Sequence, residues 1–167
     1  MRVALGHKAR VGKDTIGSHL CATLGFKRLT FTEPLYHIVD TIQDTLGHDI
    51  QKDGDLMQMT GDVCRKKYGP DVFIKPLLIN VANSGATPIV VTDMRFKNEM
   101  QILKKLGFIT IRVDRPNRPF DRDPTHRSET ELDDADYDYV IVNDGTIGEL
   151  EAAIDTILSG SPPKNGD

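Results

Sequence analysis

Cysteine and long apolar runs are both scarce in this sequence, and each shortage excludes a class of protein. The two cysteines, Cys21 and Cys64, are far apart and have no partners at metal-ligand spacing, so we expect neither a disulfide framework nor a zinc site. No apolar run approaches the roughly 20 residues that cross a bilayer, and the opening MRVALGHKAR becomes polar too early for a signal peptide. We therefore expect a cytoplasmic protein without a membrane partner.

Positive charge is not in excess either. The chain has 21 Lys and Arg against 25 Asp and Glu, a net charge of -4, which argues against a nucleic acid as partner. Its 167 residues are 38% hydrophobic and 28% charged, and this globular composition excludes collagen-like, low-complexity and wholly disordered chains. We predict one domain over residues 1–159 and a disordered tail over 160–167.

Strand and helix patterns alternate along the chain. This alternation predicts an α/β fold in three layers, a parallel sheet of about five strands with helices on both faces. Ligands of such sheets lie at the carboxyl ends of the strands, where we expect Gly6, Asp93 and Arg115. The predicted strands are 3–5, 28–32, 88–92, 108–113 and 139–142, and the predicted helices are 14–24, 34–46, 56–68, 71–82 with a kink at Pro76, 98–106 and 147–158.

The strongest motif runs from Gly6 to Thr15, between the first strand and the first helix. This is the context of a phosphate-binding loop, in which backbone N–H groups cradle phosphates and Lys13 reaches the β and γ phosphates. Two features depart from the standard pattern: His7 takes the place of the first glycine, and Asp14 replaces the Ser or Thr that touches Mg²⁺. An ordinary glycine-rich turn is the alternative interpretation.

Charged residues near two other strand ends complete the candidate site. Asp93 suits the acidic position that holds Mg²⁺ in phosphate-loop enzymes, or it could cap a helix, and Arg95 could point into the same cleft. A long polar segment over 115–136 predicts an arginine-rich lid that neutralises a transferring phosphoryl group and excludes water, with a solvated basic loop as the alternative. Its candidate arginines are Arg112, Arg115, Arg118, Arg122 and Arg127.

Five segments together resemble one known family. They are KARVGKDT at 8–15, FTEPL at 31–35, VTDMRFKNE at 91–99, HRSETEL at 126–132 and NDGTIGEL at 143–150. The chain resembles the bacteriophage-type deoxynucleoside monophosphate kinases of the P-loop nucleoside monophosphate kinase group, although Phe73 stands where that family tends to have Trp. The resemblance implies a P-loop NTPase fold with acceptor-binding helices over about 33–84, and it is compatible with a homodimer.

The activity that the resemblance implies is transfer of the γ-phosphate of ATP, with Mg²⁺, to a deoxynucleoside monophosphate. The attacking phosphate oxygen is already largely anionic near neutral pH, since its second pKa is about 6, so no general base is required. The enzyme must hold two polyanions together and keep water away from the phosphoryl group.

Site residues follow from the resemblance by position, and several keep a structural alternative. Arg65 could be a surface helix arginine, Glu33 could stabilise its helix, and Ser128 with Glu131 could form a capping box, with Glu129 anchoring a lid arginine. Asn143 could approach the adenine or simply form a turn. The implied sets are Ala9, Arg10, Val11, Gly12, Lys13, Asp14, Thr15 and Asn143 for ATP; Asp14 and Asp93 for Mg²⁺; Phe31, Glu33, Pro34, Arg65 and Arg95 for the acceptor; and Lys13, Arg95, Arg115 and Arg118 for catalysis.

Two rival functions remain at this point. A kinase of another acceptor, such as dephospho-coenzyme A, would need a base for a hydroxyl proton, and Asp14 is the candidate. A nucleotide-binding regulator would instead hydrolyse ATP slowly without any acceptor.

Overall fold

The structure is a computed structural model that describes residues 1–117, 119 and 122–160. The predicted role of Arg118 and the predicted tail beyond Gly160 lie outside these residues. The strands are β1 (Arg2–Gly6), β2 (Lys27–Leu29), β3 (Ile89–Met94), β4 (Ile109–Asp114) and β5 (Tyr139–Val142). The helices are α1 (Lys13–Leu24), α2 (Glu33–Thr45), α3 (Gly54–Tyr68), α4 (Ile74–Ala82), α5 (Lys97–Lys105), α6 (Arg127–Thr130) and α7 (Ile147–Leu158).

The five strands form one parallel sheet in the order β2-β3-β1-β4-β5, which confirms the predicted fold class. The register brings the strand ends together, because Gly6 at the end of β1 lies beside Met94 of β3 and Arg112 of β4. The loops that follow these three strands therefore meet at one edge of the sheet, where the sequence places its charged motifs.

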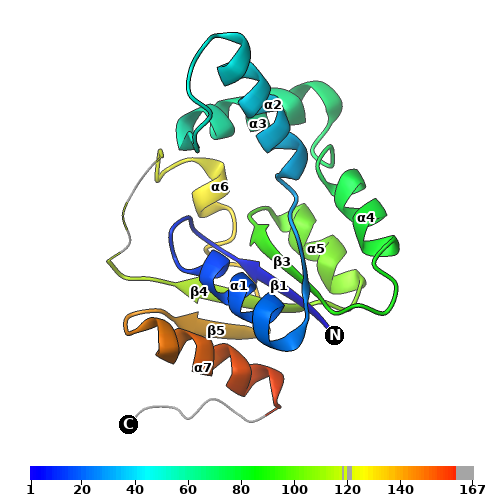
Figure 1. Cartoon of the computed structure of the whole chain (residues 1–167), viewed down its shortest axis with the longest axis vertical. Helices are drawn as coiled ribbons and strands as arrows, with labels where there is room; N and C mark the ends of the chain where they lie inside the picture. Colours follow the sequence, from blue (N-terminus) through cyan, green and yellow to red (C-terminus); the bar gives the residue numbers. More distant parts are fainter. Residues whose placement is uncertain (118, 120–121, 161–167) are drawn as a thin grey trace.

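Alternating residues of the strands build a core on each face of the sheet. Val3, Leu5 and Val90 belong to one buried cluster with α1 and α7, whereas Ala4 and Val91 belong to another with α2, α3, α4 and α5. This period of two explains why the central strands read as continuous apolar runs, since both faces are covered. Figure 1 shows α2 and α3 at one end of the molecule, with α6 between them and the sheet.

Three local predictions are wrong, each for a physical reason. The second strand ends at Leu29 rather than at residue 32, because the N–H groups of Phe31 and Thr32 bind the Asp93 carboxylate instead of a neighbouring strand. The fourth helix begins at Ile74 rather than at residue 71. Pro76 therefore lies in its first turn, where a missing N–H costs nothing, and causes no kink.

The capping box predicted for Ser128 and Glu131 is also wrong. His126 caps α6, since its ring nitrogen Nδ1 accepts a hydrogen bond from the Ser128 N–H at 3.1 Å, and Ser128 lies inside the helix. The Glu131 carboxylate instead accepts from the Lys97 N–H at 2.9 Å and pairs with Arg127. The same Ser-x-x-Glu spacing also arises when the helix begins before the serine, and α6 begins at Arg127.

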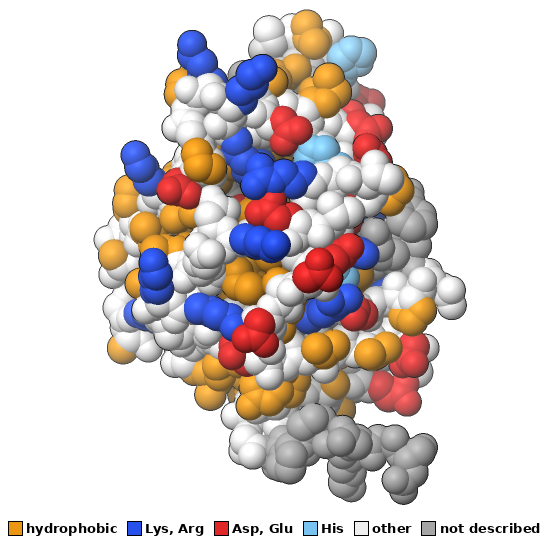
Figure 2. Space-filling model, turned by 180° about the vertical axis from the view of Figure 1, so that it is seen from behind, with side chains coloured by type: hydrophobic (Ala, Val, Ile, Leu, Met, Phe, Trp, Pro, Cys, Tyr) orange, Lys and Arg blue, Asp and Glu red, His pale blue; other side chains and the backbone are white. Residues whose placement is uncertain are grey.

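The surface of the molecule carries charges of both signs. Figure 2, viewed from behind, shows Lys and Arg side chains interspersed with Asp and Glu across that face. Over the described ranges, no helix has both the length and the apolar character that crossing a membrane requires.

Candidate active site

The loop between β1 and α1 is tightly turned. His7, Arg10 and Gly12 have φ values of 86°, 60° and 106°, all in the left-handed region. A Cβ on Gly12 would lie 2.6 Å from Asn143 Nδ2, so both the backbone and the close packing require glycine there. At Gly6 the φ is not positive, but a Cβ would lie 2.6 Å from Met94 Cε and 2.8 Å from the Tyr137 hydroxyl, so these side chains would have to shift.

Lys13, the first residue of α1, lies beneath this loop and is only 6% exposed. Its ammonium donates to the carbonyl oxygen of Lys8 and lies 3.4 Å from that of His7. Burial holds the pKa of Lys13 well below its usual value, and the positive charge of Arg95 adds to this effect. A polyanion bound at the loop would oppose both influences and favour the ammonium form.

The loop lines a cavity of about 320 Å³. Most of the predicted site residues line it, although they come from five different parts of the chain. The predicted residues at the cavity are Ala9, Arg10, Val11, Gly12, Lys13, Asp14, Thr15, Arg65, Asp93, Arg95, Arg115 and Arg122.

Four predicted binding residues lie outside the cavity lining, and Pro34 is one of them. The Phe31 side chain is 1% exposed and belongs to the hydrophobic core, and Glu33 is exposed in the first turn of α2, where it lies 3.5 Å from Asn80 Nδ2. The Asn143 amide donates to the Val11 carbonyl at 2.9 Å, so this side chain stabilises the phosphate-binding loop. Arg112 and Arg127 pair with Asp114 and Glu131 and are likewise absent from the lining.

The two carboxylates predicted for magnesium line the same cavity as Lys13. Asp93 does not cap α5; its oxygens accept from Phe31 N at 3.0 Å, Thr32 N at 3.0 Å and Thr32 Oγ1 at 2.6 Å. Asp14 is exposed and pairs with Arg28. No three His, Cys, Asp or Glu side chains converge within the described residues to hold a metal. Proteins bind Mg²⁺ with one or two carboxylates, phosphate oxygens and water, and these two carboxylates lie at the cavity that the phosphate-binding loop lines.

Arg65 lies at the α3 side of the cavity and is not a surface arginine. Its guanidinium carbon is 4.0 Å from the ring centroid of Phe96 and 4.8 Å from that of Phe73, so two aromatic rings hold it. Its Nη2 is 3.6 Å from Glu99 Oε1. The position where the resembling family tends to have Trp thus keeps an aromatic ring, and that ring contacts the arginine.

Glu99 is a pocket residue to which the sequence interpretation gave no role. It is 3% exposed, and its Oε2 accepts from Arg95 N at 2.8 Å and Phe96 N at 3.1 Å at the start of α5. Burial raises its pKa to about 7. Near neutral pH the carboxyl is therefore partly protonated, which leaves Arg65 with net positive charge toward the cavity. The sequence does carry a signal for the contacts of Glu99, because an acidic residue at the third position of a helix is typical of N-terminal capping.

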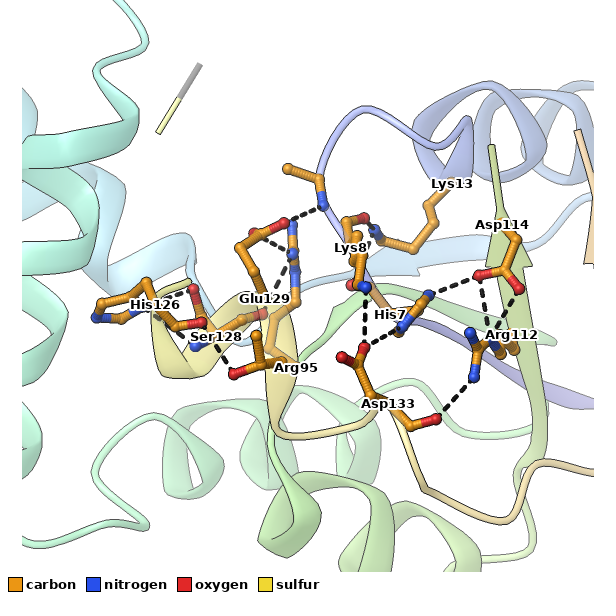
Figure 3. A network of polar contacts seen from close by, with 12 residues as sticks. His7, Lys8, Lys13, Arg95, Arg112, Asp114, His126, Ser128, Glu129 and Asp133 are labelled. Carbon is orange, nitrogen blue, oxygen red and sulfur yellow. Dashed lines mark hydrogen bonds and ion pairs between the residues drawn. The ribbon is translucent and has the colours of Figure 1, made fainter. Parts of the chain in front are cut away.

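Glu129 of α6 joins the loop to the end of β3. Its carboxylate accepts from Arg95 Nη1 at 2.6 Å and from the Ala9 N–H at 2.9 Å, and its side chain has no exposed area (Figure 3). Its arginine partner among the contacts described here, Arg95, comes from beside β3. The expectation that Glu129 also anchors a lid arginine stays a prediction. Other lining residues without a predicted role include Arg28, Tyr36, Met57, Gln58 and Phe96.

Comparisons with known proteins show that this chain is similar to kinases. The family model described as "Deoxynucleotide monophosphate kinase" matches residues 54–154. A protein of Acanthamoeba polyphaga mimivirus named "Putative deoxynucleotide monophosphate kinase" is 38% identical over 183 residues, covering 92% of this chain and 94% of the viral protein.

Among solved structures, two shikimate kinases share the fold. The one from Aquifex aeolicus has a TM-score of 0.57 and 18% identity over 96% of this chain and 97% of its own. The one from Acinetobacter baumannii has a TM-score of 0.55 and 17% identity over 98% of this chain and 95% of its own.

Proposed function

Because the chain belongs to the deoxynucleotide monophosphate kinase family, and is thus a phosphotransferase, we propose that it transfers the γ-phosphate of ATP to a deoxynucleoside 5'-monophosphate. The observation that carries this proposal is one cavity that cationic groups from distant parts of the chain line together. Lys13 comes from the start of α1 and Arg65 from α3, and Arg95 and Arg115 also line the cavity. Such a cavity suits two phosphorylated molecules held end to end.

The phosphate-binding loop receives the donor. Its backbone N–H groups and the positive end of α1 bind the ATP phosphates, and the Lys13 ammonium neutralises charge on them. Asp14 and Asp93 would hold Mg²⁺, which supplies charge neutralisation at the phosphates when bound. The hydrogen bonds that Asp93 accepts from Phe31 and Thr32 fix the orientation of its carboxylate.

The acceptor phosphate binds at Arg65 and Arg95. The two rings around Arg65 immobilise the guanidinium, so it needs little ordering when an anion arrives. Glu129 orients Arg95 in the same way through its 2.6 Å contact. The acceptor oxygen is largely anionic already, so the residues have to align it and reduce charge repulsion rather than remove a proton.

A hydroxyl acceptor would need a base, and the arrangement of Asp14 does not favour that reaction. Its carboxylate pairs with Arg28, which competes for the lone pairs that a general base would use. A phosphate acceptor avoids this difficulty. The shikimate kinases share the fold at under 20% identity, so their acceptor is not transferred to this chain.

The test is a coupled ADP-release assay with ATP and Mg²⁺ against each deoxynucleoside and ribonucleoside monophosphate, dephospho-coenzyme A, and a blank without acceptor. We expect fast release that depends on at least one deoxynucleotide, and loss of this release in Lys13→Ala with the fold retained by circular dichroism. Lys66→Ala, an exposed lysine of α3 outside the cavity lining, is the matched control. Release only with dephospho-coenzyme A, or equal release in the blank, would overturn the proposal.

A further inference from the structure

His7 is a buried histidine inside the phosphate-binding loop, and the proposed reaction gives it no role. It is 4% exposed and has a φ of 86°, in the positive range where residues other than glycine are uncommon. Glycine would adopt this conformation without strain, and glycine is the residue that the standard loop has at this position. A strained residue persists only where its surroundings hold it, so the contacts of the ring are informative.

Both nitrogens of the ring contact carboxylates from distant parts of the chain (Figure 3). Nδ1 is 2.6 Å from Asp114 Oδ1, and Nε2 is 2.7 Å from Asp133 Oδ1. Asp114 is the last residue of β4, and Asp133 follows α6. Residues 115–132, called here the arginine segment, lie between these two aspartates. One imidazole therefore fastens the phosphate-binding loop to both ends of the arginine segment.

Cationic groups lie beside both carboxylates that contact the ring. Arg112 Nε donates to Asp114 Oδ2 at 2.8 Å, and the Lys8 ammonium is 3.0 Å from Asp133 Oδ1. Burial lowers the pKa of His7, and the charges of Arg112 and Lys8 lower it further, whereas the hydrogen bond to Asp133 and the charge of Asp114 oppose this effect. Both ring contacts can be hydrogen bonds only if the three groups share two protons.

Groups of the candidate site lie next to each fastening point. Arg115 directly follows Asp114 and lines the cavity. Glu129 lies four residues before Asp133 and binds both Ala9 of the loop and Arg95. A displacement of either end of the arginine segment would therefore move a cationic group relative to the loop.

We propose that His7 is a positioning residue that fixes the phosphate-binding loop relative to Arg115 and to the Glu129–Arg95 pair. The inference rests on the proposed function, because it assigns His7 to the transfer step. His7 touches neither substrate; it acts through the two aspartates. A misplacement of reacting groups by about 1 Å can cost on the order of a hundredfold in rate, so a lost tether is measurable.

The experiment compares wild type with His7→Gly, Asp133→Asn and the double variant. Glycine keeps the backbone conformation without strain and removes the ring, so the fold should survive. We expect kcat to fall by about tenfold or more with little change in the KM for ATP, because the loop itself still binds phosphates. Asp133→Asn should lose less, and the double variant no more than His7→Gly, because both changes break one tether. Asp136→Asn, a fully exposed neighbour, is the control and should match wild type.

A second measurement does not depend on turnover. Amide hydrogen exchange at Ala9, whose N–H is donated to Glu129, should be faster in His7→Gly and Asp133→Asn than in wild type and Asp136→Asn. If His7→Gly fails to fold, Asp133→Asn carries both measurements.

The outcomes separate the two proposals. Wild type without acceptor-dependent transfer would refute the proposed function, and exchange at Ala9 would still test the tether. An active wild type with unchanged kcat in His7→Gly would overturn the role of His7, as would additive losses in the double variant. The kcat loss could also disappear at a lower temperature where every variant is fully folded. That result would show that His7 has only a structural role, and it would overturn the positioning role as well.

Discussion

Truncation of Glu129 tests whether a buried carboxylate holds the candidate site together. Its side chain has no exposed area, and it accepts hydrogen bonds from Arg95 at 2.6 Å and from the Ala9 N–H at 2.9 Å. Hydrogen bonds to charged groups contribute about 1.5–3 kcal/mol each, and removing one partner of a buried ion pair costs about 3–5 kcal/mol. We therefore expect Glu129→Ala to lower the free energy of unfolding by about 3–5 kcal/mol.

Glu129→Gln separates charge from shape. The amide oxygen can still accept one of the two hydrogen bonds, but the ion pair with Arg95 is lost and an N–H group must take the other position. The expected loss is about 1–3 kcal/mol, between wild type and the alanine variant. If cavity formation alone set the cost, glutamine would be nearly neutral because it fills the same volume.

Urea unfolding followed by circular dichroism measures these free energies, with Asp134→Ala as an exposed acidic control in the same segment that should stay within about 0.5 kcal/mol of wild type. A cost below about 1 kcal/mol for Glu129→Ala would refute the reasoning, because it would mean that the carboxylate is not held by these two donors.

Three further predictions concern other parts of the molecule. The pKa of Glu99 is about 7 in the folded chain against 4.5 when unfolded, so the folded chain binds this proton more tightly. The contribution of Glu99 to the free energy of unfolding therefore falls by up to about 3 kcal/mol as the pH rises from 4.5 to 7. Urea unfolding of Glu99→Gln over this pH range should lack the decline. Gly17→Ala should destabilise α1 by about 1–3 kcal/mol in thermal unfolding despite better helix propensity, because its Cβ would lie 2.6 Å from Thr92 Cγ2; a stabilised variant would contradict this. Arg115→Ala should lower kcat more than either KM in steady-state assays, and a change in the acceptor KM alone would make Arg115 a binding residue.

The parts of the fold that the sequence predicts well are those set by local chemistry. The apolar β-branched run of β3 and the sequence from Gly6 to Thr15 each permit few other structures, so the sheet and the phosphate-binding loop follow directly. Helix α7 is predicted to the residue, because its apolar positions recur at helical spacing and Leu158 is its last one.

The parts that the sequence does not predict depend on contacts between distant residues. An aromatic residue after a strand can face a pocket or the core, and only the fold places Phe31 in the core and Phe96 against Arg65. The tether of His7 joins residues that are 107 and 126 positions apart, so neither spacing nor periodicity could indicate it. A carboxyl such as Glu99 acquires its raised pKa from burial, which the sequence does not state.

The most direct test of the central claim identifies the products of one reaction. The chain is incubated with ATP, Mg²⁺ and an equimolar mixture of the four deoxynucleoside monophosphates, and the nucleotides are then separated by anion-exchange chromatography. We expect at least one deoxynucleoside diphosphate, formed in an amount equal to the ADP released. ADP accompanied by inorganic phosphate, with all four monophosphates unchanged, would contradict it.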